Sequence, residues 1–122
     1  MAAPATILTV DDDPDVREFA NNVLAEAGYR VLEAQSGEAA LRVIENEPEI
    51  QLILTDIVMP GLNGIDLARQ VQARRPEMKV LYASGYWAHI VNSLDGEQVV
   101  GKPFRAADLV NRVRRALGEA VP

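Results

Sequence analysis

Residues 6–14 read TILTVDDDP, and this stretch decides the class of fold. Thr6–Val10 is a short, nearly unbroken apolar run, which is typical of a strand buried on both faces of a parallel sheet. The run stops at three successive aspartates, and Pro14 follows them. Because Asp13 can cap a helix that begins at Pro14, the stretch predicts a strand, a tight turn and a helix.

The alternation of strand and helix repeats along the chain. Apolar residues at helical spacing, among them Phe19, predict a helix that Gly28 ends. Further strands are predicted over residues 29–34, 51–55, 79–83 and 99–101. Three further helices are predicted: one capped by Ser36, a second that ends at Ala73, and a third over residues 105–119. Strands that alternate with helices in this way predict one α/β domain, residues 1–122, with a parallel sheet and helices on both faces.

The segment between Ser84 and Gln98 carries only a weak helical signal. His89–Leu94 could supply one or two turns, but Gly85 and Gly96 leave little room for more. We therefore expect the helix in this position, the fourth, to be short or irregular.

Composition excludes several classes of protein. The 122 residues contain no cysteine, which rules out disulfides and thiolate chemistry, and the net charge of −6 argues against direct binding to nucleic acid. The apolar runs are too short to span a bilayer, and the first residues lack the features of a secretory signal. We therefore expect a soluble cytoplasmic protein that does not associate with membranes.

Acidic residues gather where the predicted strands end. Asp11 and Asp12 follow the first strand and Asp56 follows the third, while Ser84 and Lys102 follow the fourth and fifth. The carboxyl ends of parallel strands share one edge of a sheet, where ligands bind in folds of this kind. Three carboxylates together need a compensating cation, and a hard divalent ion, Mg²⁺, is the one that we expect.

These residues, taken together, resemble the receiver domain of bacterial two-component response regulators. The resemblance rests on residues 10–14 (VDDDP), on residues 56–60 (DIVMP) with Gly64, on Ser84, and on residues 102–104 (KPF). It covers essentially the whole chain. It implies a doubly wound, flavodoxin-like sheet of five parallel strands in the order 2-1-3-4-5.

The resemblance also implies a role for each residue of the acidic edge. Asp56 would accept a phosphoryl group from the phosphohistidine of a histidine kinase or phosphotransfer protein. Asp12 would bind Mg²⁺ directly, Asp11 through water, and Val58 through its main-chain carbonyl. Lys102, which in this family commonly precedes a cis proline, and Ser84 would bind the phosphoryl oxygens. Such a domain is no enzyme beyond its own phosphorylation and dephosphorylation.

One position departs from the family pattern. Receivers usually carry a tyrosine or phenylalanine three residues before the lysine, and here that residue is Val99. Tyr86 and Trp87 lie shortly after Ser84, so our hypothesis is that they replace the missing aromatic side chain. The alternative is that they only cover the end of the sheet.

Other readings of the chain differ in what it does as a whole. It could be a complete single-domain regulator that switches the binding of a downstream protein, or a receiver cut from a hybrid kinase or longer regulator. A phosphatase with an aspartate nucleophile is disfavoured, because such enzymes carry a second aspartate where this chain has Val58. Neither the cognate kinase nor the downstream target follows from the sequence.

Overall fold

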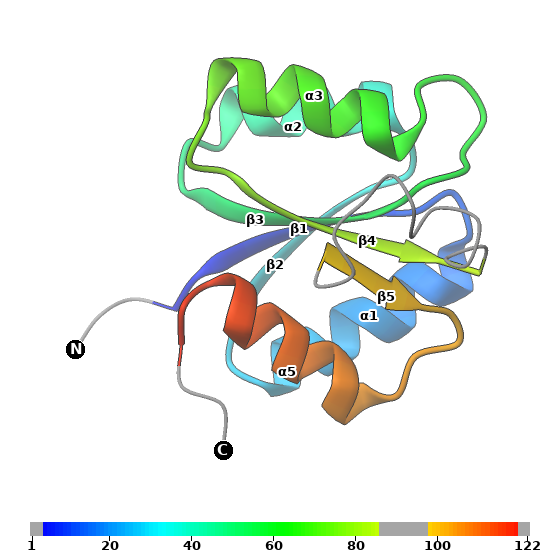
Figure 1. Ribbon diagram of the computed structural model, residues 1–122, viewed down its shortest axis with the longest axis vertical. Coiled ribbons are helices and arrows are strands. Elements are labelled where there is room, and N and C mark those ends of the chain that lie inside the picture. The colour runs from blue at the N-terminus through cyan, green and yellow to red at the C-terminus, as the bar shows by residue number, and fades with distance from the viewer. Residues whose placement is uncertain (1–3, 86–97, 120–122) are drawn as a thin grey trace.

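The structure is a computed structural model that describes residues 4–85 and 98–119, and within them a five-stranded parallel sheet runs in the order β2-β1-β3-β4-β5 (Figure 1). This order is the one that the family resemblance implied. The strands are β1 (Thr6–Val10), β2 (Arg30–Ala34), β3 (Ile50–Asp56), β4 (Lys79–Ser84) and β5 (Val99–Gly101). The helices are α1 (Pro14–Glu26), α2 (Gly37–Asn46), α3 (Gly64–Arg74) and α5 (Ala106–Ala116).

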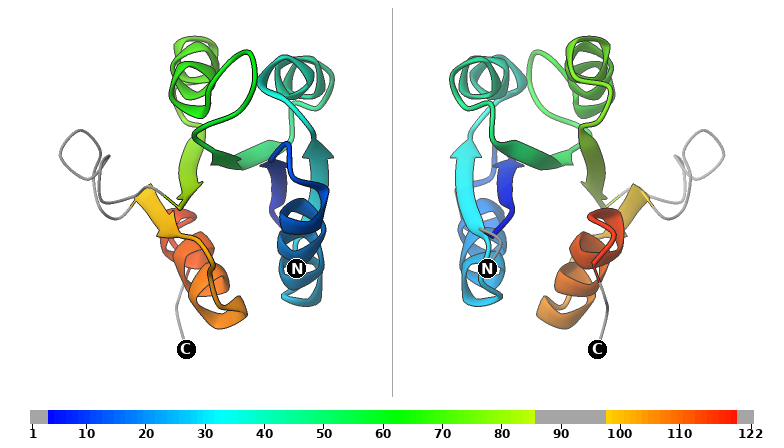
Figure 2. Two further views of the ribbon diagram at one scale, coloured as in Figure 1. Left: turned by 90° about the vertical axis from the view of Figure 1, so that its right-hand side faces the viewer. Right: turned by 90° about the vertical axis from the view of Figure 1, so that its left-hand side faces the viewer.

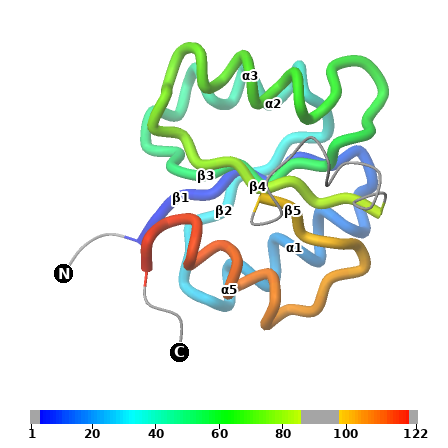
Figure 3. The backbone as a smooth tube through the Cα atoms, in the orientation of Figure 1, coloured from blue at the N-terminus to red at the C-terminus, as the bar shows by residue number. Residues whose placement is uncertain are grey.

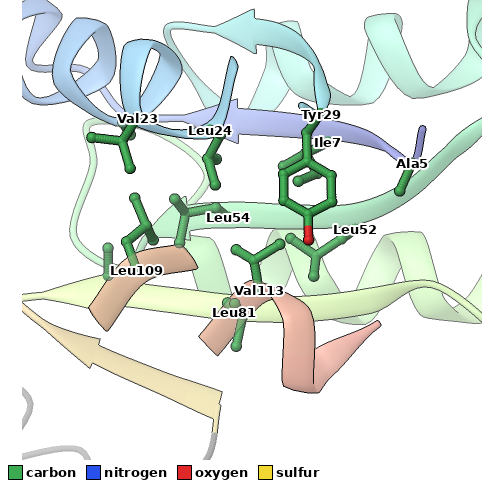
Figure 4. Close-up of a cluster of buried hydrophobic side chains, with 12 residues drawn as sticks. Ala5, Ile7, Val23, Leu24, Tyr29, Leu52, Leu54, Leu81, Leu109 and Val113 are labelled. Atoms are coloured by element: carbon green, nitrogen blue, oxygen red, sulfur yellow. The ribbon is translucent and has the colours of Figure 1, made fainter. Parts of the chain in front are cut away.

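Helices cover both faces of the sheet, as predicted. The end-on views of Figure 2 show α2 and α3 on one face and α1 and α5 on the other. Each face has its own apolar cluster, because residues of the central strands point alternately to the two sides. Figure 4 shows the cluster under α1 and α5, where Leu24 and Leu109 meet Leu54 of β3 with no exposed surface on either leucine.

Side-chain caps begin the helices where the sequence predicts them. The Asp13 carboxylate accepts a hydrogen bond from the Asp15 backbone N–H at 2.9 Å, with Pro14 as the first helical residue. The Ser36 hydroxyl accepts one from Ala39 N–H at 3.1 Å. Each cap satisfies a backbone donor that the first helical turn leaves unpaired.

Some predicted features differ from the structure. Phe19, predicted to face the core, is 45% exposed, because its ring packs not among the buried residues but against Phe104, itself only partly buried, at a centroid distance of 5.8 Å. The last helix ends at Ala116, three residues early, and Gly118 follows with a φ of +77°. The predicted fourth helix falls within residues 86–97, which lie outside the described residues.

The turns that follow β1, β3 and β5 lie at one edge of the sheet. Figure 3 shows the turns after β1 and β3 and the turn between β5 and α5 at the same, right-hand side of the molecule. The chain returns tightly after β3, since a Cβ atom on Gly64 would lie 2.1 Å from the Asp56 carbonyl oxygen. Only glycine fits there, and the turn is held directly over the end of β3.

Candidate functional site

Three carboxylates converge at this edge. Asp11 and Asp12 directly follow β1, Asp56 is the last residue of the neighbouring strand β3, and one oxygen atom of each lies within 4.8 Å of the others. Asp11 is buried, Asp56 is half-buried and Asp12 is exposed. The structure therefore brings together the three carboxylates that the sequence predicts to meet.

Lys102 supplies the positive charge that opposes them. Its Nζ atom lies 2.8 Å from Oδ2 of Asp11 and 3.4 Å from Oδ2 of Asp56. The peptide bond to Pro103 is cis, as the resemblance implied. The Lys102 backbone N–H donates to the carbonyl of Ser84 at 3.0 Å, which holds the turn after β5 against the end of β4.

The surroundings of these charges shift two pKa values upward. Burial raises the pKa of Asp56, the charge of Asp11 adds to the effect, and the charge of Lys102 opposes it. Burial by itself lowers the pKa of Lys102, but the hydrogen bond and the charge of Asp11, with the charge of Asp56, raise it above its usual value. Lys102 is therefore a fixed cation, but its single positive charge does not balance the negative charge of the three carboxylates.

The two oxygens of Asp56 have different surroundings. Oδ1 accepts a hydrogen bond from the Ile57 backbone N–H at 2.8 Å, and Oδ2 is the atom that faces Lys102. The Thr55 hydroxyl donates to the Asp56 carbonyl at 2.9 Å. These contacts fix the orientation of a carboxylate that is 14% exposed.

The remaining predicted site residues lie on the adjoining elements. Ser84 ends β4, beside β3, and is 1% exposed. The Val58 side chain is 63% exposed, and the role of its carbonyl stays a prediction. Val99 is buried and pairs with Tyr82 of β4, so Tyr82 belongs to the core. Tyr86 and Trp87, the hypothetical substitutes for the missing aromatic residue, lie outside the described residues.

Two charged side chains that the sequence analysis did not single out also hold the loops of the site. Arg17 donates from Nη1 to the main-chain carbonyl of Asp11 at 2.7 Å. The Glu38 carboxylate, on α2, accepts from the Leu62 backbone N–H in the loop after β3 at 3.2 Å. Glu38 and Leu62 are 24 residues apart, and Arg17 reaches the Asp11 carbonyl only from its place against Glu33 of β2, 16 residues away. Helical spacing alone could therefore at most have shown which face of a helix each residue occupies.

Comparison with known proteins places this arrangement in one family. The response regulator receiver domain family matches residues 7–114. The response regulator receiver protein CpdR of Brucella abortus is 38% identical over 116 residues, which cover 91% of this chain and 95% of CpdR. The sensor kinase CckA of the same organism is 32% identical over 122 residues, but this chain spans only 13% of its length.

Solved structures agree. A crystal structure of the receiver domain from the hybrid histidine kinase CckA superposes with a TM-score of 0.79 at 33% identity, covering 93% of this chain and 99% of that one. The response regulator TrrA of Thermotoga maritima, solved in complex with Mg²⁺ and BeF, superposes with a TM-score of 0.82 at 30% identity, covering 92% and 98%.

The fold and the acidic edge thus define a signalling domain of the two-component class. This chain belongs to the response regulator receiver domain family. Receiver domains of this family bind Mg²⁺ at an acidic pocket, and the three convergent carboxylates here form a cluster that could hold a metal ion.

Proposed function

We propose that Asp56 accepts a phosphoryl group from the phosphohistidine of a histidine kinase or histidine phosphotransfer protein. The observation that carries the proposal is the placement of Asp56: it ends a central strand, beside the carboxylates of Asp11 and Asp12, with Oδ2 3.4 Å from Lys102 Nζ. A nucleophile for phosphoryl transfer needs an oriented oxygen and nearby positive charge, and Asp56 has both.

The donor set fits Mg²⁺. Asp11, Asp12 and Asp56 offer hard oxygen ligands, and we propose the main-chain carbonyl of Val58 as a further one. The excess of negative charge, which Lys102 alone does not balance, is a second reason to expect a divalent cation here. When bound, the metal would supply positive charge to the oxygens of the transferring group.

The residues of the chain then have separate tasks. The backbone N–H of Ile57 holds Oδ1 of Asp56, and Oδ2, which now faces Lys102, would attack the phosphorus as the bond to the donor imidazole breaks. Lys102, now between Asp11 and Asp56, would pair with a phosphoryl oxygen. Ser84, at the adjacent strand end, would donate a hydrogen bond to another.

The proposal extends to the chain as a whole. We take residues 1–122 to be a single receiver domain that acts in the cytoplasm, that is no enzyme beyond its own phosphotransfer and dephosphorylation, and that changes its affinity for a downstream protein when phosphorylated. CpdR, which this chain nearly spans, supports a regulator built of one receiver, whereas CckA supports a receiver within a hybrid kinase. Val58, where aspartate-nucleophile phosphatases place an aspartate, weighs against a phosphatase.

Phosphorylation by a small-molecule donor tests the proposal without the cognate kinase. The protein is incubated with a phosphoramidate, with and without Mg²⁺, and its intact mass is measured. We expect one phosphoryl group on the wild-type chain only when Mg²⁺ is present. Asp56→Asn should take up none, and Asp15→Asn, an exposed aspartate in the first turn of α1, should behave as wild type.

A different outcome would contradict the assignment. Undiminished uptake by Asp56→Asn would place the phosphoryl group elsewhere, and equal uptake in the presence of a chelator would remove the metal from the reaction.

A further inference from the structure

Arg17 contacts the backbone of the acidic edge rather than its carboxylates. It lies in α1, one turn after the aspartates, and its Nη1 donates to the main-chain oxygen of Asp11 at 2.7 Å. Its Nε donates to Glu33 of β2 at 2.8 Å, and its side chain is only 15% exposed. Within the described part of the chain these are the two groups that hold the guanidinium.

Further hydrogen bonds hold Glu33, the partner of Arg17, in place. The second oxygen of Glu33 accepts from the Asn21 side-chain amide at 2.9 Å, and Oδ1 of Asn21 accepts from the Thr9 hydroxyl at 2.5 Å. Arg17 and Asn21 are four residues apart, so they share a face of α1, and Thr9 and Glu33 are neighbours in the register of β1 and β2. The network therefore ties α1 to both strands and leaves Arg17 little freedom.

The carbonyl that Arg17 holds belongs to the peptide that links Asp11 to Asp12. A rotation of this peptide would move both carboxylates, because it changes the backbone angles on either side of it. The Asp11 carboxylate is held separately, by the Asp13 backbone N–H at 2.9 Å and by Lys102. Arg17 lines, with Asp11 and Asp56, a cavity of about 10 Å³, so its side chain lies beside the acidic edge as well as contacting its backbone.

We infer that Arg17 is a positioning residue of the metal site: it orients the Asp11–Asp12 peptide so that both carboxylates face the cation. The inference rests on the proposed function, since it assigns a role within the same site. Partners of metal ligands typically change metal affinity by about 10- to 100-fold when they are removed.

The competing role for Arg17 is that of a simple charge, and the two roles predict opposite signs. A cation near the acidic cluster repels Mg²⁺, so neutralising it would strengthen binding if charge were all that mattered. If Arg17 orients the ligands, neutralising it weakens binding in spite of the removed repulsion. The direction of the change therefore distinguishes the two roles.

Calorimetric titration of the protein with Mg²⁺ alone measures whether the Mg²⁺ affinity rises or falls. We expect Arg17→Gln to bind Mg²⁺ about tenfold more weakly than wild type. Arg17→Lys should lie between them, because an ammonium group can reach the carbonyl but lacks the fork that also binds Glu33. The matched control is Arg74→Gln, which removes an Arg–Glu pair with Glu45 at the far end of α3 and should bind as wild type does.

An uncharged substitution keeps the inference testable if Arg17→Gln does not fold. Asn21→Ala breaks the support of Glu33 without changing any charge, so it should weaken Mg²⁺ binding by a few-fold, a change that simple charge does not explain. Melting temperatures measured without Mg²⁺ separate a loss of fold from a loss of orientation.

The outcomes are distinct. Equal or tighter binding by Arg17→Gln, or unchanged binding by Asn21→Ala, would overturn the positioning role while leaving the metal site in place. Absence of Mg²⁺ binding by the wild-type chain would instead overturn the metal site of the proposed function and this inference with it.

Discussion

The two edges of the sheet carry charges in contrasting ways. At the carboxyl edge, three carboxylates converge, Lys102 pairs with two of them, and one of these two, Asp11, is only 5% exposed. At the amino edge, Arg30 pairs with Glu49 at 2.5 Å and with Glu47 at 3.9 Å, and all three side chains are about one-third to one-half exposed. Like charges meet at both edges, but of these two groups only the one at the carboxyl edge includes a buried carboxylate, that of Asp11.

Solvent makes this difference important. Water screens the repulsion between Glu47 and Glu49, so their arrangement has little effect on folding. Asp11 and Asp56 at the acidic edge are screened much less, and the fold tolerates their charges because packing, backbone hydrogen bonds and Lys102 hold them in place. Destabilising charge at a cleft is typical of a site that binds an ion, whereas paired exposed charge is typical of ordinary surface.

The largest expected effect on stability is at the turn behind Asp56. Gly64→Ala puts a Cβ atom 2.1 Å from the Asp56 carbonyl oxygen, and since that atom is backbone, the whole turn must move. We expect a loss of about 3 kcal/mol in the free energy of unfolding, measured by urea denaturation. Gly85→Ala is the control, because its Cβ would meet nothing within 4 Å. A loss as small as that of the control would mean that the turn adapts.

The next largest effect is expected at Asp56, where the substitution that should abolish phosphorylation should also stabilise the fold. Asp56→Asn removes a half-buried carboxylate whose pKa burial raises, so in metal-free buffer at neutral pH the variant should be more stable than wild type, by about 1 kcal/mol. Glu49→Gln, at the exposed edge, should leave stability nearly unchanged, because water screens the charge of Glu49 and its pair with Arg30. Urea denaturation with a chelator present measures both.

The pH dependence provides a check on sign. A carboxyl whose folded pKa lies above its unfolded value destabilises the fold where it is ionised, and the effect disappears as pH falls through the folded pKa. The stability advantage of Asp56→Asn should therefore shrink on acidification. An advantage that grows instead, or a variant less stable than wild type at neutral pH, would show that contacts of Asp56 outweigh its repulsion.

The smallest effect is expected at the amino edge, where Tyr29 donates to Glu119 at 2.6 Å. Burial and this hydrogen bond raise the pKa of Tyr29 from 10.0 to about 12. The contact therefore stabilises the fold fully below pH 10, and this stabilisation is lost as the pH rises from 10 through the folded pKa of about 12. Tyr29→Phe should cost about 0.5–1 kcal/mol at neutral pH and progressively less above pH 10. A difference from wild type that stays constant with pH would exclude the hydrogen bond as its cause.

Most of the confirmed predictions rest on patterns within a few neighbouring residues. The apolar runs of β1 and β3, the caps Asp13 and Ser36, and the carboxylates at strand ends follow from neighbours within a few residues. Knowing that parallel strands share an edge was enough to bring Asp11, Asp12 and Asp56 together.

Contacts between distant elements could not be predicted in this way. The exposure of Phe19 depends on where Phe104 lies, and the hydrogen bond of Arg17 depends on the register of β1 and β2, which places Glu33 beside Thr9. Helical spacing could have put Arg17 and Asn21 on one face of α1, but only the packed structure shows that this face meets β2.

Chemical localisation of the phosphoryl group tests the central claim most directly. The protein is phosphorylated with a phosphoramidate and Mg²⁺, treated with borohydride, which reduces an aspartyl phosphate to homoserine, and mapped by peptide mass spectrometry. We expect homoserine at residue 56 and aspartate unchanged at 11, 12, 13 and 15. Homoserine at any of those four positions, with residue 56 unmodified, would contradict the assignment of Asp56 as the phosphoacceptor.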